Sequence, residues 1–289
     1  MSDLQIAIGP MLFLWQKQTL DAFYLAAAQS NADIVYVGET VCAKRRLSKL
    51  TDYLNWAAML AEAGKTVVLS TMTLLESAGQ LAELKRICKQ ADFLVEANDL
   101  AAVQQLHEHG LPFVIGPAVN VYNGFTLAKL AKMGAVRWVM PVELSKDWLV
   151  KLQTEYAETC DLPMQYEVLS YGYLPLAYSA RCFTARHYDL DKDQCELICQ
   201  QHAQGLATFS QEGQRVFTLN GTQTMSGDIY NLCEDVLSLR QVADVSRLSM
   251  HQFSDLEWVD RFLSASTIKR PADHINGFWH QLAGINAQY

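Results

Sequence analysis

Short apolar runs alternate with amphipathic stretches along most of the chain. The runs are rich in Val, Ile, Leu and aromatic residues without a clean in–out alternation, which is typical of strands buried on both faces of a parallel sheet. The pattern predicts strands at residues 4–9, 33–38, 66–71, 92–97, 113–118, 136–141 and 164–170. A long interruption follows, and then an eighth run at residues 244–250.

The stretches between these runs have the period of helices. In residues 48–65, Leu50, Tyr53, Leu54 and Ala57 recur at three- and four-residue steps, and Gly64 stands where a helix C-cap is expected. Eight such strand–helix units favour a (β/α)8 TIM-type barrel over a doubly wound sheet. A doubly wound, dinucleotide-binding sheet would carry the glycine-rich motif G-x-G-x-x-G after a strand. The segment "GETVCA", which follows the second strand, does not have this motif.

The interruption after the seventh strand is interpreted as an insertion within a single barrel domain, residues 1–289. The insertion covers about residues 171–227. Its segment "GQRVFTLNGTQTMSG" predicts a hairpin with Asn220-Gly221 as the turn. Residues 228–243 are predicted to form a helix before the eighth strand.

The cysteines are distributed unevenly over this barrel. In such barrels the loops that follow the strands gather at the C-terminal face, where active sites are built. The insertion carries Cys182, Cys195 and Cys199, and Cys42 follows the second strand, so topology nominates Cys42 as a fourth ligand on that face. The other thiols lie elsewhere: Cys88 and Cys233 in apolar helical stripes, as buried structural thiols, and Cys160 towards the opposite face.

Four thiolates are the ligands of either zinc or an iron–sulfur cluster. The spacing of Cys195 and Cys199 predicts that both lie on one face of a helical turn. Paired C-x2-C knuckles, common in structural zinc sites, are absent from this set, which favours a cluster. Zinc and unrelated free thiols stay open as alternatives.

Composition narrows the class of protein. A net charge of -8 argues against broad binding to nucleic acid. No apolar run approaches the roughly 20 residues of a membrane span, so we expect a chain that does not cross a membrane. The first residues have no basic segment, and seven cysteines is an odd number for a disulfide framework. We therefore expect a cytoplasmic location.

Four segments together carry a family resemblance: "GPMLFLW", "YVGETVCAKRR", "LPLAYSARCFTAR" and "DQCELIC". They resemble the collagenase-like peptidase family, in its branch of ubiquinone-biosynthesis proteins, over essentially the whole chain. The resemblance implies a 4Fe–4S cluster as cofactor, and the ligands that it implies are Cys42, Cys182, Cys195 and Cys199. It also implies a role in oxygen-independent (anaerobic) hydroxylation in ubiquinone biosynthesis rather than proteolysis.

The resemblance further implies partners and a co-substrate. A UbiU-like subunit would complete a heterodimer, and a lipid carrier or other ubiquinone-biosynthesis proteins would be further partners. Prephenate would be the hydroxyl donor. Two alternatives remain within the family: an RNA-base hydroxylation factor and a non-catalytic electron-transfer subunit.

One position departs from the family pattern. Many relatives carry a further cysteine seven residues before the position of Cys182, and this chain has Pro175 there. The departure indicates that Cys42 replaces a ligand lost from another loop. It also weakens any transfer of peptidase activity.

Several charged residues beside the cysteines are further candidates. Arg45, Arg46 and Arg181 are candidate substrate-binding residues, which would hold a carboxylate or the charge of the cluster, or would simply be solvated. Glu39 and Glu96 end the second and fourth strands at the catalytic face, where carboxylates serve as acid–base groups or hydrogen-bond partners. Tyr178 is expected to line the approach to Cys182.

Overall fold

The computed structural model describes residues 4–264 and 269–288. Within these residues, eight parallel strands close into a barrel, because β6 pairs with β7, β7 with β13, and β13 with β1. The barrel strands are β1 (Gln5–Ile8), β2 (Ile34–Val37), β3 (Thr66–Ser70), β4 (Leu94–Ala97), β5 (Phe113–Ile115), β6 (Ala135–Val139), β7 (Gln165–Gly172) and β13 (Val245–Leu248). The predicted (β/α)8 TIM-type barrel is confirmed.

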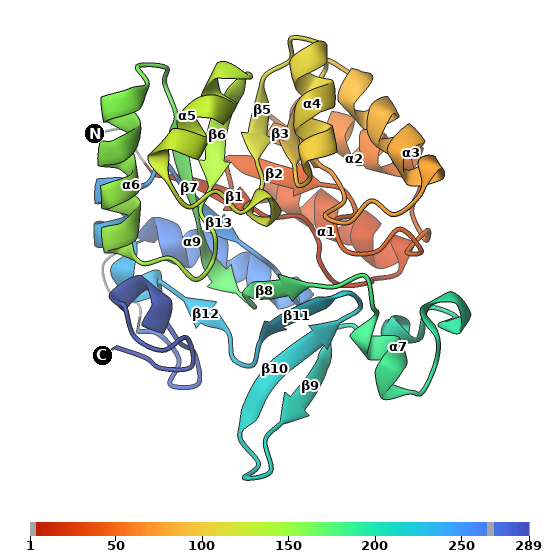
Figure 1. Ribbon diagram of the computed structural model, residues 1–289. Coiled ribbons are helices and arrows are strands. Elements are labelled where there is room, and N and C mark those ends of the chain that lie inside the picture. Colours follow the sequence, from red (N-terminus) through yellow and green to blue (C-terminus); the bar gives the residue numbers. More distant parts are fainter. Residues whose placement is uncertain (1–3, 265–268, 289) are drawn as a thin grey trace.

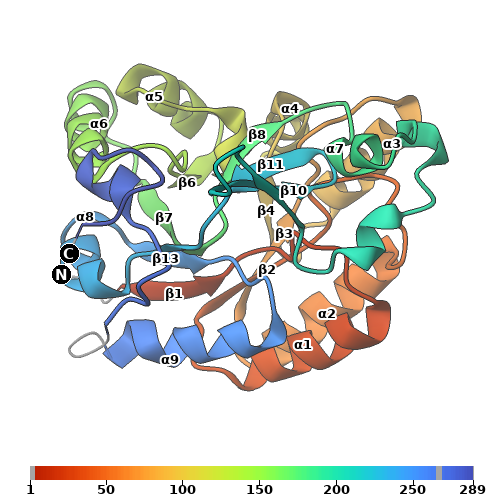
Figure 2. The same cartoon turned by 90° about the horizontal axis from the view of Figure 1, so that it is seen from below.

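Helices follow the strands and surround the barrel (Figures 1 and 2). They are α1 (Lys17–Gln29), α2 (Leu50–Glu62), α3 (Ala78–Lys89), α4 (Leu100–Glu108), α5 (Gly124–Lys132), α6 (Lys146–Thr159), α8 (Val236–Val242) and α9 (Glu257–Ser264). None of the helices in the described ranges is both long and apolar enough to cross a membrane.

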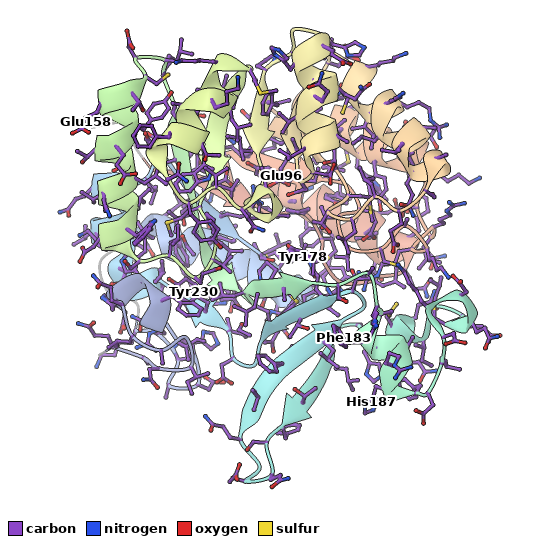
Figure 3. All side chains as sticks on the ribbon, viewed as in Figure 1. Glu96, Glu158, Tyr178, Phe183, His187 and Tyr230 are labelled. Atoms are coloured by element: carbon purple, nitrogen blue, oxygen red, sulfur yellow. The ribbon has the colours of Figure 1, made fainter. Side chains whose placement is uncertain are left out.

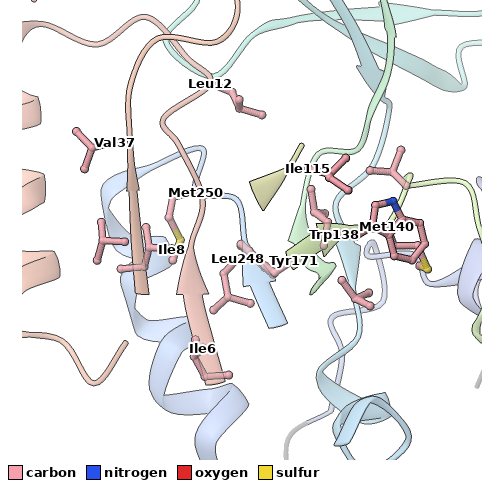
Figure 4. Close-up of a cluster of buried hydrophobic side chains, with 14 of the residues drawn as sticks. Ile6, Ile8, Leu12, Val37, Ile115, Trp138, Met140, Tyr171, Leu248 and Met250 are labelled. Carbon is pink, nitrogen blue, oxygen red and sulfur yellow. The ribbon is translucent and has the colours of Figure 1, made fainter. Parts of the chain in front are cut away.

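Alternate side chains of each strand face different surroundings, as the pleat requires. In β1, Ile6 and Ile8 belong to the core between strands and helices, part of which Figure 4 shows, whereas Ala7 belongs to a smaller cluster. In β2, Val35 and Val37 belong to the larger core, and Tyr36 to the smaller cluster. The smaller cluster lies inside the barrel and comprises Ala7, Ile34, Tyr36, Val68, Val114, Val139 and Val245. The runs lack simple polar–apolar alternation because both faces are buried.

The insertion builds a second, antiparallel sheet. Its strands are ordered β8 (Pro175–Tyr178), β11 (Gln223–Ser226), β10 (Arg215–Asn220) and β9 (Leu206–Phe209). Seen along the barrel in Figure 2, this sheet lies across the ring of strands, and the short helix α7 (Phe183–His187) lies beside it. The insertion therefore covers the end of the barrel at which functional sites are built.

Two local predictions about the insertion and the segment after it are wrong. Asn220 still pairs with Gln223, so the hairpin loop is Gly221-Thr222, one residue later than predicted. The side chain of Asn220 is buried, and its amide donates to the carbonyl of Leu12. Residues 228–243 are not one helix, because Tyr230 and Asn231 form β12, which pairs with β7 before α8 begins.

The carboxylate of Asp255 fixes the turn before α9. Its Oδ2 accepts the backbone N–H of His251 at 2.8 Å and lies 2.7 Å from His251 Nδ1, and its Oδ1 accepts from the hydroxyl of Tyr171. Burial opposes ionisation, but the hydrogen bond and charge of His251 outweigh it, so the pKa of Asp255 lies below its usual range. The ionised carboxylate therefore stabilises the folded chain.

Replacing Asp255 with asparagine is expected to lower the free energy of unfolding by about 1–3 kcal/mol at pH 7. A carboxylate with a lowered pKa contributes in full above its unfolded pKa of about 3.9 and loses that contribution as the pH falls through the folded pKa. The gap between wild type and Asp255→Asn should therefore close below about pH 4, as urea unfolding at stepped pH measures. Asp260→Asn, at an exposed position, is the control. A gap that stays constant from pH 7 to 3 would contradict this role.

Candidate functional site

The loop after β2, which carries Cys42, is tied to the insertion by several polar contacts. Lys44 Nζ donates to the carbonyl of Lys192 at 2.7 Å and forms an ion pair with Asp193. From the hairpin, the hydroxyl of Thr222 donates to the carbonyl of Val41 at 2.7 Å. Segments separated by about 150 residues in sequence are thereby held together.

The four cysteines nominated from the sequence are electrostatic neighbours. Burial raises the pKa of Cys42, and the nearby thiol of Cys182 adds to the increase. Burial likewise raises the pKa of Cys199, with further contributions from Cys182 and Cys195. The thiols of the two loops therefore influence one another electrostatically, and their role as ligands stays a prediction.

The backbone around the three insertion cysteines is irregular. Cys182 caps α7, and its Sγ accepts the N–H of Ala185 at 3.5 Å. Between Cys195 and Cys199, Glu196 and Leu197 both have positive φ values, of 42° and 58°. The prediction that these two cysteines share a helical turn is wrong, because two left-handed residues stand between them.

Arg45 is a buried cation that influences two of these thiols, Cys42 and Cys199. Its side chain is 1% exposed, and its Nη1 and Nη2 donate to the carbonyl of Leu12 and to Asn220 Oδ1, at 2.6 and 2.7 Å. Its charge lowers the pKa values of both Cys42 and Cys199 against the opposing effect of burial. Arg45 therefore favours thiolates at this place, and bonds from Leu12 and the hairpin hold it there.

Glu39 braces the Cys42 loop. Its Oε1 accepts the backbone N–H groups of Val41 and Cys42 at 2.8 and 3.0 Å. Burial raises the pKa of Glu39, and Arg45 and these two N–H groups oppose the increase. The observed contacts give Glu39 a role in shaping the loop.

The thiols can be compared with what a metal ion and an iron–sulfur cluster each require. In the part of the chain that the structure describes, no three His, Cys, Asp or Glu side chains converge as ligands of one metal ion. A cluster spreads its cysteine ligands over several irons and is stabilised by hydrogen bonds to sulfur. Thiols that influence one another, a buried arginine and an N–H bonded to Cys182 Sγ are groups that a cluster would use, and the cluster itself stays a prediction.

The other two candidate arginines differ from Arg45 because both are exposed. Arg46 is exposed and lines a cavity of about 630 Å³ between α2 and α3, while Arg181 is exposed beside Cys182. Nothing in their contacts singles out either as a substrate ligand. The remaining cysteines, Cys88, Cys160 and Cys233, are buried, as predicted for the first and last of them.

The hairpin turn at Gly221 lies close to the guanidinium of Arg45, so a side chain added there should lower stability. Gly221 has a φ of 65°, and a Cβ there would lie 3.0 Å from Arg45 Nη2. We expect Gly221→Ala to lower the free energy of unfolding by about 1–2 kcal/mol in urea titrations. Gly213→Ala is the matched control, because Gly213 also has a positive φ but its Cβ would meet nothing within 4 Å. Equal losses in the two variants would show that the arginine contact is unimportant.

Sequence reasoning missed a charged network inside the barrel. Arg247 Nε donates to Glu167 Oε1 at 2.6 Å, its Nη1 lies 2.8 Å from Glu96 Oε1, and its guanidinium stacks 4.0 Å from the ring of Tyr36. Burial opposes the charge, but Glu167 and Glu96 raise the pKa of Arg247, so it stays protonated. The sequence feature that could have revealed this network is a charged residue in the middle of a buried strand, as in "DVSRLSM" and "QYEVLS".

Arg137 extends the network away from the covering sheet. Its Nη1 donates to the hydroxyl of Tyr36 at 3.2 Å and lies 3.5 Å from Glu167, while its Nε donates to Gln165 at 3.0 Å. Barrel interiors are ordinarily filled by branched apolar side chains. Buried ions cost desolvation energy that apolar packing would avoid, so packing alone does not explain this network.

Tyr178 and Pro175, on β8, lie over the barrel rather than beside the cysteines. Both line the cavity that contains Glu96 and Arg247. Figure 3 shows Tyr178 below Glu96, near the middle of the molecule. Tyr178 therefore lies at the mouth of the barrel, and not on the approach to Cys182 as the sequence led us to expect.

Three solved structures are similar to this chain over most of its length. The U32 peptidase Mk0906 is 10% identical, with a TM-score of 0.47, covering 86% of this chain and 94% of that one. The spore cortex-lytic enzyme SleL of Bacillus cereus is 10% identical, with a TM-score of 0.44 and coverages of 92% and 75%. A GH18 chitinase from Pseudoalteromonas aurantia is 11% identical, with a TM-score of 0.39 and coverages of 91% and 100%.

A comparison with protein families gives a more specific result. Residues 19–248 match the family described as Peptidase family U32. The matched segment includes barrel strands from β2 to β13, the insertion and the cysteines at 42, 182, 195 and 199. Because this match extends over most of its 289 residues, the chain belongs to Peptidase family U32.

Proposed function

We propose that the protein is a 4Fe–4S protein of the UbiV type, required for oxygen-independent hydroxylation in ubiquinone biosynthesis as a heterodimer with a UbiU-like subunit. The observation that carries the proposal is the electrostatic coupling of four thiols from two loops, two of which, Cys42 and Cys199, are also influenced by the buried Arg45. The sequence resemblance supplies the pathway and the partner. Proteolysis is not proposed, because the sequence contains neither a G-x-S-x-G nor an H-E-x-x-H motif.

The chain's own residues would prepare the site for this cofactor. Cys42, Cys182, Cys195 and Cys199 would hold the cluster, which when bound supplies electron transfer or polarisation of the oxygen donor. Arg45 would offset thiolate charge, and the N–H of Ala185 would stabilise charge on Cys182 Sγ. The ion pair of Lys44 with Asp193 would keep the two loops closed.

Exposed aromatic side chains on the insertion support a protein partner there. Phe209 of β9 is 64% exposed and Phe217 of β10 is 40% exposed, and Phe183 and Tyr188 are also exposed beside the cysteines. Aromatic residues are enriched among the side chains that dominate binding energy at protein interfaces. We propose that the UbiU-like subunit docks on this side of the insertion.

The double variant Phe209→Ser/Phe217→Ser is expected to weaken binding of a co-expressed UbiU-like subunit by tenfold or more, because two apolar anchors are lost. Affinity purification without oxygen, followed by titration of the two subunits, measures this. Phe125→Ser on α5, where Phe125 is 70% exposed, is the control and should bind normally. Equal loss in both variants, or no loss in the double variant, contradicts the docking site.

The pathway is tested by deleting the gene in its own organism. The proposal predicts that ubiquinone disappears in cells grown without oxygen and is retained in cells grown with oxygen. The wild-type gene should restore it, and Cys182→Ala should not. Unchanged ubiquinone under both conditions would contradict the proposed pathway, and a change confined to RNA modification would favour the RNA-base alternative.

A further inference from the structure

A cavity of about 630 Å³ lies between α2 and α3, which are neighbours around the barrel (Figures 1 and 2). We call it the α2–α3 cavity. Small-molecule sites are ordinarily cavities of about 300–1,000 Å³ with walls that are largely apolar. This cavity has the size and the apolar wall of such a site, and the apolar side chains come from β3, the loop after it and the two helices: Leu50, Leu69, Met72, Leu75, Leu84 and Ile87.

Three cations line the α2–α3 cavity. Arg46 and Lys49 come from the loop before α2, and Arg86 comes from α3. All three residues are exposed, and none of them forms an ion pair within residues 4–264 and 269–288. Their charges are therefore available to a ligand. No single one of these side chains indicates a ligand by its own contacts, but their convergence on one apolar cavity does.

Two carboxylates share the wall with these cations. Glu39 is already engaged, because its Oε1 accepts the N–H groups of Val41 and Cys42. Glu83, on α3, is exposed. The three cations therefore outnumber the one carboxylate that remains free to oppose them. Although the chain as a whole has a net charge of -8, this wall is locally positive and favours an anion.

The first turns of two helices also line the cavity. Leu50 and Thr51 begin α2, and Gly79 and Gln80 belong to the first turn of α3. The first N–H groups of a helix have no partner within the helix, and the helix dipole makes this end positive. The first turn of α3 contains no acidic residue that would offset this charge. Helix N-termini of this kind bind phosphate groups.

A buried hydroxyl without a partner lies in the same wall. Ser48 lines the cavity and is 8% exposed, and in the part of the chain that the structure describes its Oγ has no hydrogen-bond partner. Buried polar side chains are nearly always hydrogen-bonded, so this hydroxyl points to a missing partner. Ser48 directly precedes Lys49, the N-cap of α2. An oxygen of an anion bound at the start of α2 would supply that partner.

The number of donors favours a phosphate over a carboxylate. A carboxylate brings two oxygens and a single negative charge. A phosphate monoester brings three acceptor oxygens and a charge of about −1.5 to −2 at pH 7, so it can use several cations, a hydroxyl and helix N–H groups at once. The wall of the α2–α3 cavity offers all of these donors next to apolar side chains.

We propose that the α2–α3 cavity is a binding site for a phosphate ester of an organic molecule. Ser48 and the first turns of α2 and α3 would bind the phosphate, and Arg46, Lys49 and Arg86 would offset its charge. The organic part would lie against the apolar wall. The site goes beyond the function proposed above: it adjoins the loop of Cys42, but it requires neither a cluster nor a partner subunit.

The test compares phosphate esters with the same molecules without phosphate. Flavin mononucleotide and riboflavin are one pair, and hexyl phosphate and hexanol the other. Each is titrated into the full-length protein, purified without oxygen, with flavin fluorescence or calorimetry as the readout. We expect saturable binding of at least one ester, tenfold or more tighter than its phosphate-free counterpart. The pair that responds shows whether the organic part is an aromatic ring system or an alkyl chain.

Three results of these titrations would overturn the proposal. The first is no saturable binding of either ester. The second is equal binding of each ester and its phosphate-free counterpart, which would show that the cations do not act on the ligand. The third is binding of inorganic phosphate as tight as that of the better ester, which would show that the apolar wall holds nothing.

Variants place the binding in the α2–α3 cavity. Lys49→Gln/Arg86→Gln should weaken binding of the ester tenfold or more, because two of the three cations are lost. Lys85→Gln/Lys89→Gln is the matched control, since it removes two charges from exposed positions of α3 that do not line the cavity. The control should bind as the wild type does. Equal loss in the two double variants would reveal only general electrostatic attraction, and either that result or undiminished binding in Lys49→Gln/Arg86→Gln would refute the site.

Discussion

Alanine at any one of four positions is expected to abolish iron binding: Cys42, Cys182, Cys195 or Cys199. Each change removes one thiolate ligand, and a cluster with an open iron is exposed to solvent and lost during purification. Iron and acid-labile sulfide should fall from about four of each per chain to less than about one. Metal analysis of protein purified without oxygen measures the loss, together with the visible absorption of the cluster.

The other three cysteines provide the matched controls. Cys88→Ala, Cys160→Ala and Cys233→Ala remove buried thiols from helices and connections, so they should lose some stability but keep full iron content. Retention of iron by Cys42→Ala would show that the site is completed by another residue. Loss of iron in all seven variants would indicate general unfolding rather than a ligand role.

Arg247→Met is expected to have the largest effect on stability of any single change in the barrel interior. It would leave Glu96 and Glu167, which are 1% and 0% exposed, without their shared cation. Breaking a buried ion pair by removing one partner costs about 3–5 kcal/mol. Urea unfolding should show a midpoint shifted to lower denaturant with an unchanged slope.

Two companions distinguish the electrostatic cause from lost packing. Arg240→Met, at an exposed position of α8, should change stability by less than about 0.5 kcal/mol. Adding Glu96→Gln to Arg247→Met should recover part of the loss, because it removes one of the stranded charges. A double variant less stable than Arg247→Met alone would show that packing, not charge, dominates.

The order of strands and helices could be predicted because local sequence determines it. Runs such as those of β2 and β3 are apolar on both faces, and each is followed by a stretch with helical period. This pattern requires only that each strand is buried on both of its faces. The position of Cys42 relative to the insertion followed from topology, since loops after parallel strands share one face of a barrel.

The details of the insertion could not be predicted, because tertiary contacts decide them. Asn220 ends a strand rather than starting a turn because Leu12 and Arg45 take its side-chain amide. Glu196 and Leu197 adopt left-handed conformations that nothing in their residue types favours. Tyr230 pairs with β7 as part of a strand, although the sequence around it has helical character.

The barrel-mouth residues escaped prediction for a different reason. Arg247 and Glu167 are far apart in sequence and meet only when the barrel closes. The sequence singled out Glu96 by its place at the end of β4, but it did not identify Arg247 as the partner of Glu96. The position of Tyr178 over the barrel follows from the pairing of β8 with β11, which is nonlocal.

Iron and sulfide analysis of the wild-type protein, purified without oxygen and examined by electron paramagnetic resonance, tests the central claim most directly. The account predicts a brown protein with about four irons and four sulfides per chain, whose reduced form gives the signal of a single 4Fe–4S cluster. A colourless protein that contains zinc, or no metal even after reconstitution with iron and sulfide, would contradict it.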